Sequence, residues 1–202
     1  MAKAVFLDRD GVINELVYHQ EWGMVDSPFT VEQLHLFPWA AAAIRRLAEA
    51  GYKVVVCSNQ PGMAKGHLSA ETFERIKERM REGLAAGGAS VDGEYYCLHH
   101  PQARVAELKR DCDCRKPRPG LLLRAAQELD IDLESSWMVG DGLSDVKAGR
   151  DAGCHTVLLG RMKCELCRLM ESEGARPDAI AQDVMEAAQI ILQWEEGDGD
   201  LH

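Results

Sequence analysis

Two aspartates stand one residue apart, directly after a short apolar run near the start of the chain. The run covers Ala4–Leu7, and Asp8, Asp10 and Gly11 follow it. A strand that is buried on both faces has such a continuous apolar pattern, and Gly11 then lets the chain leave extended geometry. Because ligands of open α/β sheets bind beyond the carboxyl ends of the strands, these carboxylates predict a divalent cation and a reaction that needs one.

Three further sets of polar side chains lie beyond predicted strands or in the loops between them. A hydroxyl and an amide can hydrogen-bond to phosphoryl oxygens, and a lysine ammonium provides a point charge for phosphate. Further carboxylates provide oxygen ligands for a metal ion. Each residue alone is more often a turn former, a solvated charge or a helix acid, but together at one edge of a sheet they favour phosphate chemistry. The sets are Ser58 and Asn59, Arg115 and Lys116, and Asp141 and Asp145.

Apolar runs typical of buried strands alternate with helical periodicity along the chain. This alternation implies parallel pairing, so we expect a three-layer α/β domain with a doubly wound parallel sheet, a small insert near residues 97–116 and no large cap domain. We expect this single domain to span residues 1–194, and the acidic segment 195–202 to be a disordered tail. The segment 15–36 is long for a loop, which makes it a candidate substrate lid. The expected strands are 4–7, 54–57, 94–98, 137–141 and 155–159, and the expected helices are 38–49, 69–86, 119–130, 144–152 and a last one from about 184.

Composition narrows the classes of partner. The formal charge is −10, from 23 Lys and Arg against 33 Asp and Glu residues, which disfavours non-specific nucleic-acid binding. No apolar run approaches the ~18–20 residues of a membrane span, and the first strand begins too early for a signal peptide. We therefore expect a cytoplasmic protein with no nucleic-acid or membrane partner. The sequence leaves the oligomeric state open.

The order of the polar sets resembles the four motifs of the haloacid dehalogenase superfamily, which consists largely of phosphohydrolases and phosphotransferases. The match runs from Asp8 to Asp145 and implies a haloacid dehalogenase-like fold. Within the superfamily, the stretches 7–14, 58–66, 95–102 and 112–117 are similar to the family of heptose-bisphosphate phosphatases. The histidinol-phosphate phosphatases share the general pattern. The resemblance implies a Mg²⁺-dependent phosphatase that removes the 7-phosphate of D-glycero-D-manno-heptose 1,7-bisphosphate, a small phosphorylated sugar.

The resemblance also implies roles for individual residues. Asp8 would be the nucleophile that forms an aspartyl-phosphate, and Asp10 the general acid and base. Mg²⁺ would be held by Asp8, Asp141 and the backbone carbonyl of Asp10, with Asp145 acting behind them or through a bound water. The transferring phosphoryl group would be held by Ser58, Asn59 and Lys116, and a second phosphate of the substrate by Arg115.

A structural zinc ion is the second cofactor that the resemblance implies. In the family a Cys-x-His and a Cys-x-Cys pair bind one zinc, and here these pairs are Cys97 with His99 and Cys112 with Cys114. Three thiolates and an imidazole form a closed tetrahedral set, which is typical of structural zinc. An odd total of seven cysteines also argues against a disulfide framework. The alternative is a set of free thiols, because these pairs are more tightly spaced than most zinc motifs.

Two features leave the interpretation open. The family often has Lys directly after its last catalytic aspartate, where this chain has Gly142; a missing cation puts the bisphosphate substrate in doubt, though not hydrolysis. Histidinol phosphate or another small ester is the alternative substrate, and a zinc-stabilised binding module without turnover is the alternative of another class. Cys164 and Cys167 are interpreted as incidental thiols, with a second metal site or a redox pair as the alternatives.

Overall fold

The protein folds around a central parallel sheet, seen in a computed structural model that describes residues 1–160, 170, 172 and 174–196. The six strands run in the order β5-β4-β1-β6-β7-β8, and every neighbouring pair is parallel. The chain therefore moves outward from β1 first to one side and then to the other, which makes the end of β1 a topological switch point. The strands are β1 (Ala4–Leu7), β4 (Lys53–Asn59), β5 (Gly93–Cys97), β6 (Trp137–Gly140), β7 (His155–Leu159) and β8 (Ala179–Ala181).

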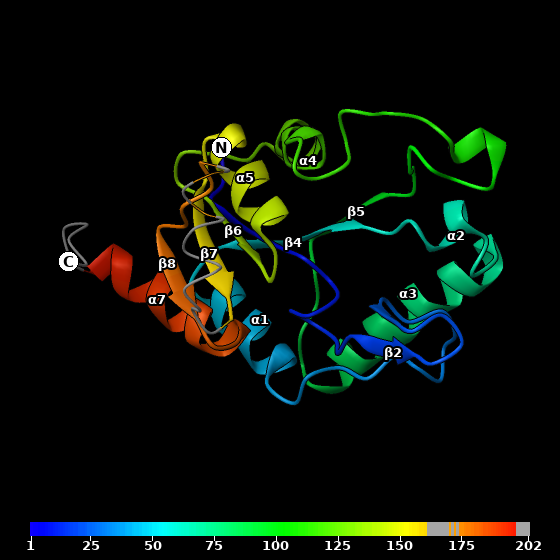
Figure 1. The fold of residues 1–202 in the computed structure, drawn as a ribbon. Coiled ribbons are helices and arrows are strands. Elements are labelled where there is room, and N and C mark those ends of the chain that lie inside the picture. The colour runs from blue at the N-terminus through cyan, green and yellow to red at the C-terminus, as the bar shows by residue number, and fades with distance from the viewer. Residues whose placement is uncertain (161–169, 171, 173, 197–202) are drawn as a thin grey trace.

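Helices cover both faces of the sheet and complete three layers (Figure 1). On one face, α1, α3 and α7 contribute the apolar side chains of a core that includes Ile44, Met80 and Ile191. On the other face, α4 and α5 pack a second core around Phe6, Leu122 and Ala148. Successive residues of a strand point to opposite faces, so Val5 belongs to the first core and Phe6 to the second. The helices are α1 (Ala40–Glu49), α2 (Gly62–Lys65), α3 (Ala70–Ala86), α4 (Gly120–Leu129), α5 (Leu143–Ala152) and α7 (Val184–Glu196).

The expected α/β architecture is confirmed, and the described residues include no large cap domain. All five expected strands are present, and β8 is one that the sequence pattern did not predict. Helix α3 begins directly after Ser69, whose hydroxyl caps it by accepting a hydrogen bond from Thr72 N–H at 3.1 Å. None of the helices in the described part of the chain is long and apolar enough to cross a bilayer.

Three local differences matter for the site. Strand β4 continues through Asn59, so Ser58 and Asn59 lie on the strand and not in the turn after it. The segment 15–36 contains an antiparallel hairpin of β2 (Val17–His19) and β3 (Met24–Asp26), where a loop was expected. Helix α7 extends through Glu196, two residues beyond the expected domain end, and the rest of the predicted tail lies outside the described residues.

Candidate active site

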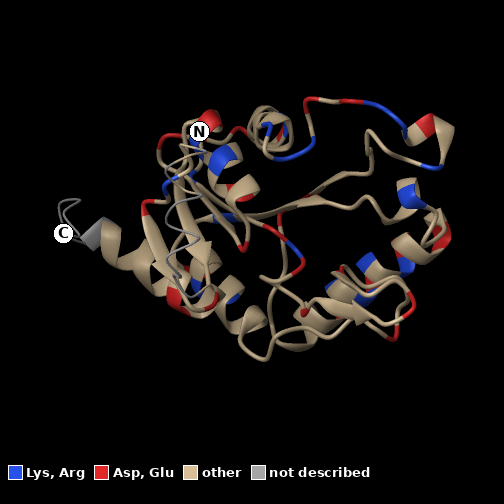
Figure 2. Cartoon of the chain, in the orientation of Figure 1, with Lys and Arg blue, Asp and Glu red and all other residues tan. Residues whose placement is uncertain are grey.

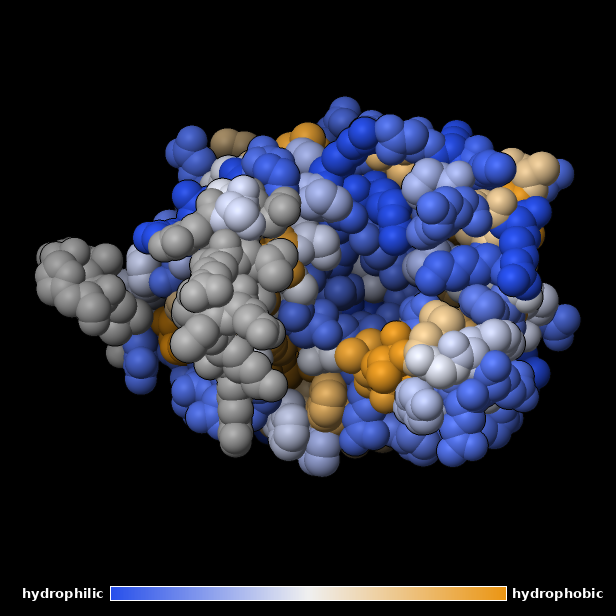
Figure 3. Space-filling view, in the orientation of Figure 1, coloured by the Kyte–Doolittle hydropathy of each residue, from blue (hydrophilic) through white to orange (hydrophobic). Residues whose placement is uncertain are grey.

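The carboxyl end of β1 brings the first two aspartates between the ends of β4 and β6. Asp8 continues the strand, because its backbone N–H donates to Val139 O at 3.0 Å. Since β4 and β6 flank β1, the side chains that follow those strands converge on Asp8. The space-filling view shows that the molecule is hollowed near the middle of one face and that hydrophilic residues line the hollow (Figure 3).

Three carboxylates and one ammonium form the centre of the site. Carboxylate oxygens of Asp8, Asp141 and Asp145 all lie within 4.8 Å of one another. The Lys116 ammonium is 3.1 Å from Asp8 Oδ1 and 2.5 Å from Asp145 Oδ1, and it donates to Cys57 O at 2.8 Å. The negative charges outnumber the positive one, and the donors on this side are all oxygens. That combination fits a hard divalent cation such as Mg²⁺.

The electrostatics of the cluster follow from crowding and burial. Burial raises the pKa of Asp8, with Lys116 opposing the shift and Asp145 adding to it. Desolvation, and then Asp8 and Asp145, raise the pKa of Asp141 to about 7, although its side chain still reaches solvent. Burial alone would lower the pKa of Lys116, but Asp145 and Asp8 outweigh it and raise that pKa above its ordinary value. Lys116 is therefore a permanent cation beside Asp8.

Gly11 is required for the close approach of Asp141. Its φ of 79° lies in the left-handed region, and a Cβ at this position would collide with the Asp141 carboxylate. Only glycine therefore satisfies both the turn after Asp10 and the packing of Asp141 against it.

Ser58 and Asn59, both predicted to bind phosphate, have different environments. The Ser58 hydroxyl is fully buried, hydrogen-bonds to the Asp8 side chain, and accepts from Gln60 Nε2 at 3.0 Å. The Asn59 amide is paired with the backbone of Lys116: its Nδ2 donates to Lys116 O at 2.9 Å, and its Oδ1 accepts from Lys116 N–H at 3.0 Å. Asn59 therefore holds the segment that delivers the Lys116 ammonium.

Arg115 lies on the 97–116 loop beside further basic groups. Its guanidinium donates to His99 O at 3.4 Å, and burial followed by Arg115 and Lys65 lowers the pKa of His100. Lys65 sits at the end of α2 and forms an ion pair with Asp26 of β3 at 3.1 Å. Figure 2 shows Lys and Arg residues in blue along the loop after β5 and at α2. Sequence reasoning singled out Arg115 and missed Lys65, which no motif marks.

Sequence reasoning also missed the three residues that surround Asp10. Arg9, Gln60 and Asn14 all donate hydrogen bonds to the Asp10 carboxylate, and all three are buried. The available signal was the placement of Arg9 between two acids on a strand end. Alternation sends its side chain away from that of Asp8, so a charged residue there must find a buried partner.

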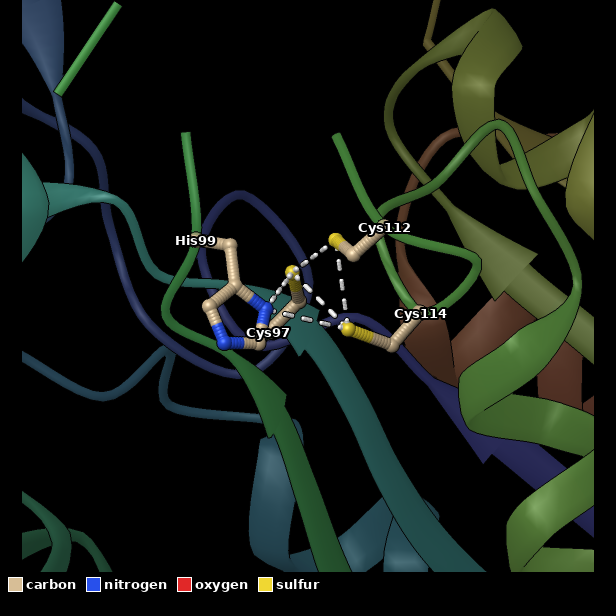
Figure 4. Close-up of side chains that lie close together, drawn as sticks. All are labelled: Cys97, His99, Cys112 and Cys114. Carbon is tan, nitrogen blue, oxygen red and sulfur yellow. Dashed lines mark hydrogen bonds between the residues drawn. The ribbon is translucent and has the colours of Figure 1, made fainter. Parts of the chain in front are cut away.

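The four predicted zinc ligands come together at the edge of the sheet (Figure 4). Cys97 ends β5, and His99, Cys112 and Cys114 come from the loop after it. The sulfur–sulfur distances are 3.3, 3.4 and 3.6 Å, and His99 Nδ1 is 3.4 and 3.8 Å from two of the sulfurs. Zinc bonds of about 2.3 Å to sulfur and 2.0–2.1 Å to nitrogen place tetrahedral ligands roughly 3.5–3.8 Å apart. The cluster therefore fits a closed zinc site.

The ligand chemistry supports the same interpretation. Burial and Arg110 lower the pKa of His99, which favours the neutral ring that binds metal. Burial raises the pKa of Cys97 well above its ordinary value, and a bound zinc ion would offset that shift by holding the thiolate. Cys57 and Cys154 lie apart from the cluster and are buried, as expected of core residues. Cys164 and Cys167 lie outside the described residues.

Comparison with known proteins gives a consistent result. Residues 113–187 match the family model described as HAD-hydrolase-like. The chain is 41% identical over 159 residues to the D-glycero-β-D-manno-heptose-1,7-bisphosphate 7-phosphatase of Pasteurella multocida, which is 79% of this chain and 82% of that protein. Identity to the enzyme of the same name in Escherichia coli K12 is 42% over 158 residues, or 78% of each chain.

Solved structures agree with the sequence comparison. The D,D-heptose 1,7-bisphosphate phosphatase of B. bronchiseptica, complexed with magnesium and phosphate, superposes with a TM-score of 0.76 and 32% identity over 95% of this chain and 98% of that one. The corresponding enzyme of Burkholderia thailandensis gives a TM-score of 0.65 and 26% identity over 94% and 98%. The fold and the sequence matches are thus those of a haloacid dehalogenase-superfamily phosphatase. Within that superfamily, the chain belongs to the family of the heptose-1,7-bisphosphate 7-phosphatases.

Proposed function

We propose that the protein is a Mg²⁺-dependent phosphatase that removes the 7-phosphate of D-glycero-β-D-manno-heptose 1,7-bisphosphate through an aspartyl-phosphate. The main support for this reaction is the position of Asp8. Its carboxylate lies at a topological switch point of the sheet, 3.1 Å from the Lys116 ammonium and grouped with Asp141 and Asp145. A carboxylate among metal-binding oxygens and a fixed cation suits nucleophilic attack on a phosphate ester.

In the first step, a carboxylate oxygen of Asp8 attacks phosphorus and the bond from phosphorus to the sugar oxygen breaks. Asp10 gives a proton to the departing oxygen, which leaves as an alcohol. Lys116 and Ser58 lie against Asp8 and stabilise the charge that develops on the phosphoryl oxygens. Asn59 acts through Lys116, whose backbone it holds.

In the second step, Asp10 takes a proton from a water molecule as the water oxygen attacks phosphorus. The bond from phosphorus to Asp8 breaks, inorganic phosphate forms, and both aspartates return to their starting states. Asp8, Asp141 and the Asp10 carbonyl would hold Mg²⁺, with Asp145 behind them next to Lys116. When bound, Mg²⁺ reduces the repulsion between the Asp8 carboxylate and the phosphate dianion.

The choice of substrate has two supports. The relatives at 41–42% identity carry the name of this activity. In addition, Arg115 on the loop and Lys65 on α2 form a basic group around His100, whose pKa burial and these two cations lower. Such a group suits the second phosphate of a bisphosphate, and it supplies cations although position 142 is glycine.

A phosphate-release screen with Mg²⁺ tests the proposal. The panel contains both anomers of the heptose 1,7-bisphosphate, the matching heptose 7-phosphate and histidinol phosphate. We expect the highest kcat/KM for the bisphosphate, with heptose 1-phosphate as the product. A higher kcat/KM for histidinol phosphate would contradict the substrate, and no turnover of any ester would favour the non-catalytic binding module.

The proposal also covers the cellular location and the partners of the enzyme. A zinc–thiolate cluster and free buried thiols at Cys57 and Cys154 suit a reducing compartment, so we propose a cytoplasmic location. The net charge of −10 makes nucleic acid an unsuitable partner.

A further inference from the structure

Arg9 is a fully buried charged residue next to the site. Its side chain is completely buried, although it stands between the two aspartates in the sequence. A buried guanidinium is costly unless it is paired and hydrogen-bonded. Its partner is the Asp10 carboxylate: Nε and Nη2 donate to Oδ1 at 3.1 and 3.0 Å, and Nη2 also reaches Oδ2 at 3.1 Å.

Gln60 closes a ring with Arg9 and Asp10. Its Oε1 accepts from Arg9 Nη2 at 2.8 Å, and its Nε2 donates to Asp10 Oδ2 at 2.5 Å. The same Nε2 lies 3.0 Å from the Ser58 hydroxyl. Gln60 is 4% exposed and its backbone N–H donates to Cys97 O at 2.8 Å, so both its side chain and its backbone are fixed. One buried amide thus connects Asp10 to Ser58.

Asn14 holds the other side of Asp10. Its Nδ2 donates to Asp10 Oδ1 at 2.9 Å and to Glu15 O at 2.9 Å. Both oxygens of the Asp10 carboxylate are therefore hydrogen-bonded by buried donors on three different residues. The Asp141 side chain, by contrast, reaches solvent.

We infer that Arg9 and Gln60 are positioning residues for proton transfer by Asp10. The inference rests on the proposed function, in which Asp10 protonates the leaving oxygen. A general acid is effective only at hydrogen-bond distance from the atom that it protonates, and a free aspartate side chain samples several rotamers. The guanidinium and the amide hold the carboxylate in one orientation.

Leaving-group dependence separates this role from simple structural support. An alkyl phosphate has a poor leaving group that needs a proton as the bond to phosphorus breaks, whereas p-nitrophenol leaves readily as an anion. The kcat/KM value reports the first phosphoryl transfer, so a misplaced Asp10 should lower kcat/KM for the alkyl ester much more than for p-nitrophenyl phosphate. Damage to the fold should lower both values by the same factor.

The variants are Gln60→Met and Arg9→Lys, with Asp10→Asn as the reference. Gln60→Met is neutral and leaves the Arg9–Asp10 pair in place, so it tests positioning without an unpaired buried charge. Arg9→Lys keeps the charge but removes the fork that contacts both oxygens. The matched control is Ser136→Ala, a fully buried serine whose hydroxyl accepts from Ala4 N–H at 2.9 Å, at the opposite end of β1.

We expect Gln60→Met and Arg9→Lys to lower kcat/KM for the heptose bisphosphate by about 10–100-fold, a part of the ~10²–10⁴-fold contribution that general acid–base catalysis makes in full. For p-nitrophenyl phosphate the loss should stay below about threefold, and Ser136→Ala should change both esters equally. Equal losses on the two esters, or no loss on either, in the Gln60→Met enzyme would overturn the inference while leaving the role of Asp10 intact. If Asp10→Asn itself shows no such selectivity, the acid role in the proposed function fails, and the inference fails with it.

Discussion

The aspartate cluster and the zinc cluster are built in opposite ways. The carboxylates of Asp8 and Asp141 directly follow strands of the sheet, and Asp145 lies in the first turn of α5, the helix after β6. The zinc cluster has one ligand, Cys97, on the sheet and takes the other three from the loop that follows. In that loop Ala103 is a buried apolar side chain, and most of its neighbours are exposed or half-buried. A segment with so little to bury does not hold a fixed shape without a further constraint.

The two regions meet at Lys116. It lies two residues beyond Cys114, and its ammonium reaches Asp8 and Asp145 in the centre of the site. Asn59 of β4 fixes its backbone from the other side. We therefore infer that the two regions have different tasks: the sheet positions the proposed nucleophile and Mg²⁺ ligands, while a bound zinc ion would fix the loop that carries Lys116. Substitutions in the two regions should therefore change different properties of the enzyme.

The largest effect is expected at the nucleophile. Asp8→Asn replaces the attacking carboxylate by an amide and should lower phosphate release by more than about 10⁴-fold, beyond the usual range for a lost general acid–base. Zinc content and melting temperature should stay close to the wild-type values, because the amide is similar in size. If Asp8→Asn protein, shown by mass spectrometry to be free of wild type, released phosphate near the wild-type rate, the proposed mechanism would be contradicted.

A smaller effect is expected for the exposed Mg²⁺ ligand. Asp141→Ala removes one oxygen donor and should raise the Mg²⁺ concentration at half-maximal activity by roughly 10–100-fold, with partial recovery at high Mg²⁺. Asp151→Ala is the control, since that acid lies on α5 in an exposed pair with Lys147. An unchanged Mg²⁺ requirement in the Asp141→Ala enzyme would remove Asp141 from the metal site.

Loss of a proposed zinc ligand should lower both stability and activity without changing the Mg²⁺ requirement. Cys112→Ser should lower zinc well below one ion per chain and reduce activity by roughly 10–100-fold, while the Mg²⁺ concentration at half-maximal activity stays the same. A cost of a few kcal/mol would lower the melting temperature by roughly 5–10 °C in a chain of this size. Full activity in zinc-depleted protein would show that zinc is not needed to position Lys116.

The smallest effect is expected from the remaining cysteines. The double substitution Cys164→Ser with Cys167→Ser should leave zinc at about one ion per chain and kcat/KM within about twofold of wild type, because the four zinc ligands form a complete set without them. Elemental analysis beside Cys112→Ser decides the assignment. Zinc retained by Cys112→Ser and lost by the double variant would place the ion at the other pair.

The fold and the centre of the site could be predicted from the sequence because both depend on strong local patterns. Apolar runs followed by acids marked β1 and β6, and Lys116 was found by its match to a motif. The position of Arg9 between two acids indicated that it needs a buried partner, but the network around Asp10 was not predictable, because Gln60 is 51 residues away from Arg9 in the sequence. Strand β8 has three residues, too few for a periodic signal. Lys65 lies on α2, which begins shortly after β4 ends, and its ion pair with Asp26 joins that helix to the hairpin; no sequence pattern marks either feature.

Chemical trapping of the phosphoenzyme tests the central claim most directly. Wild-type enzyme is mixed with the heptose bisphosphate and Mg²⁺, quenched within milliseconds, reduced with borohydride and digested for mass spectrometry. Borohydride converts an aspartyl-phosphate to homoserine, so we predict homoserine at position 8, dependent on substrate and absent from Asp8→Asn protein. Homoserine at another aspartate, or rapid turnover with unmodified Asp8 at every quench time, would contradict the account.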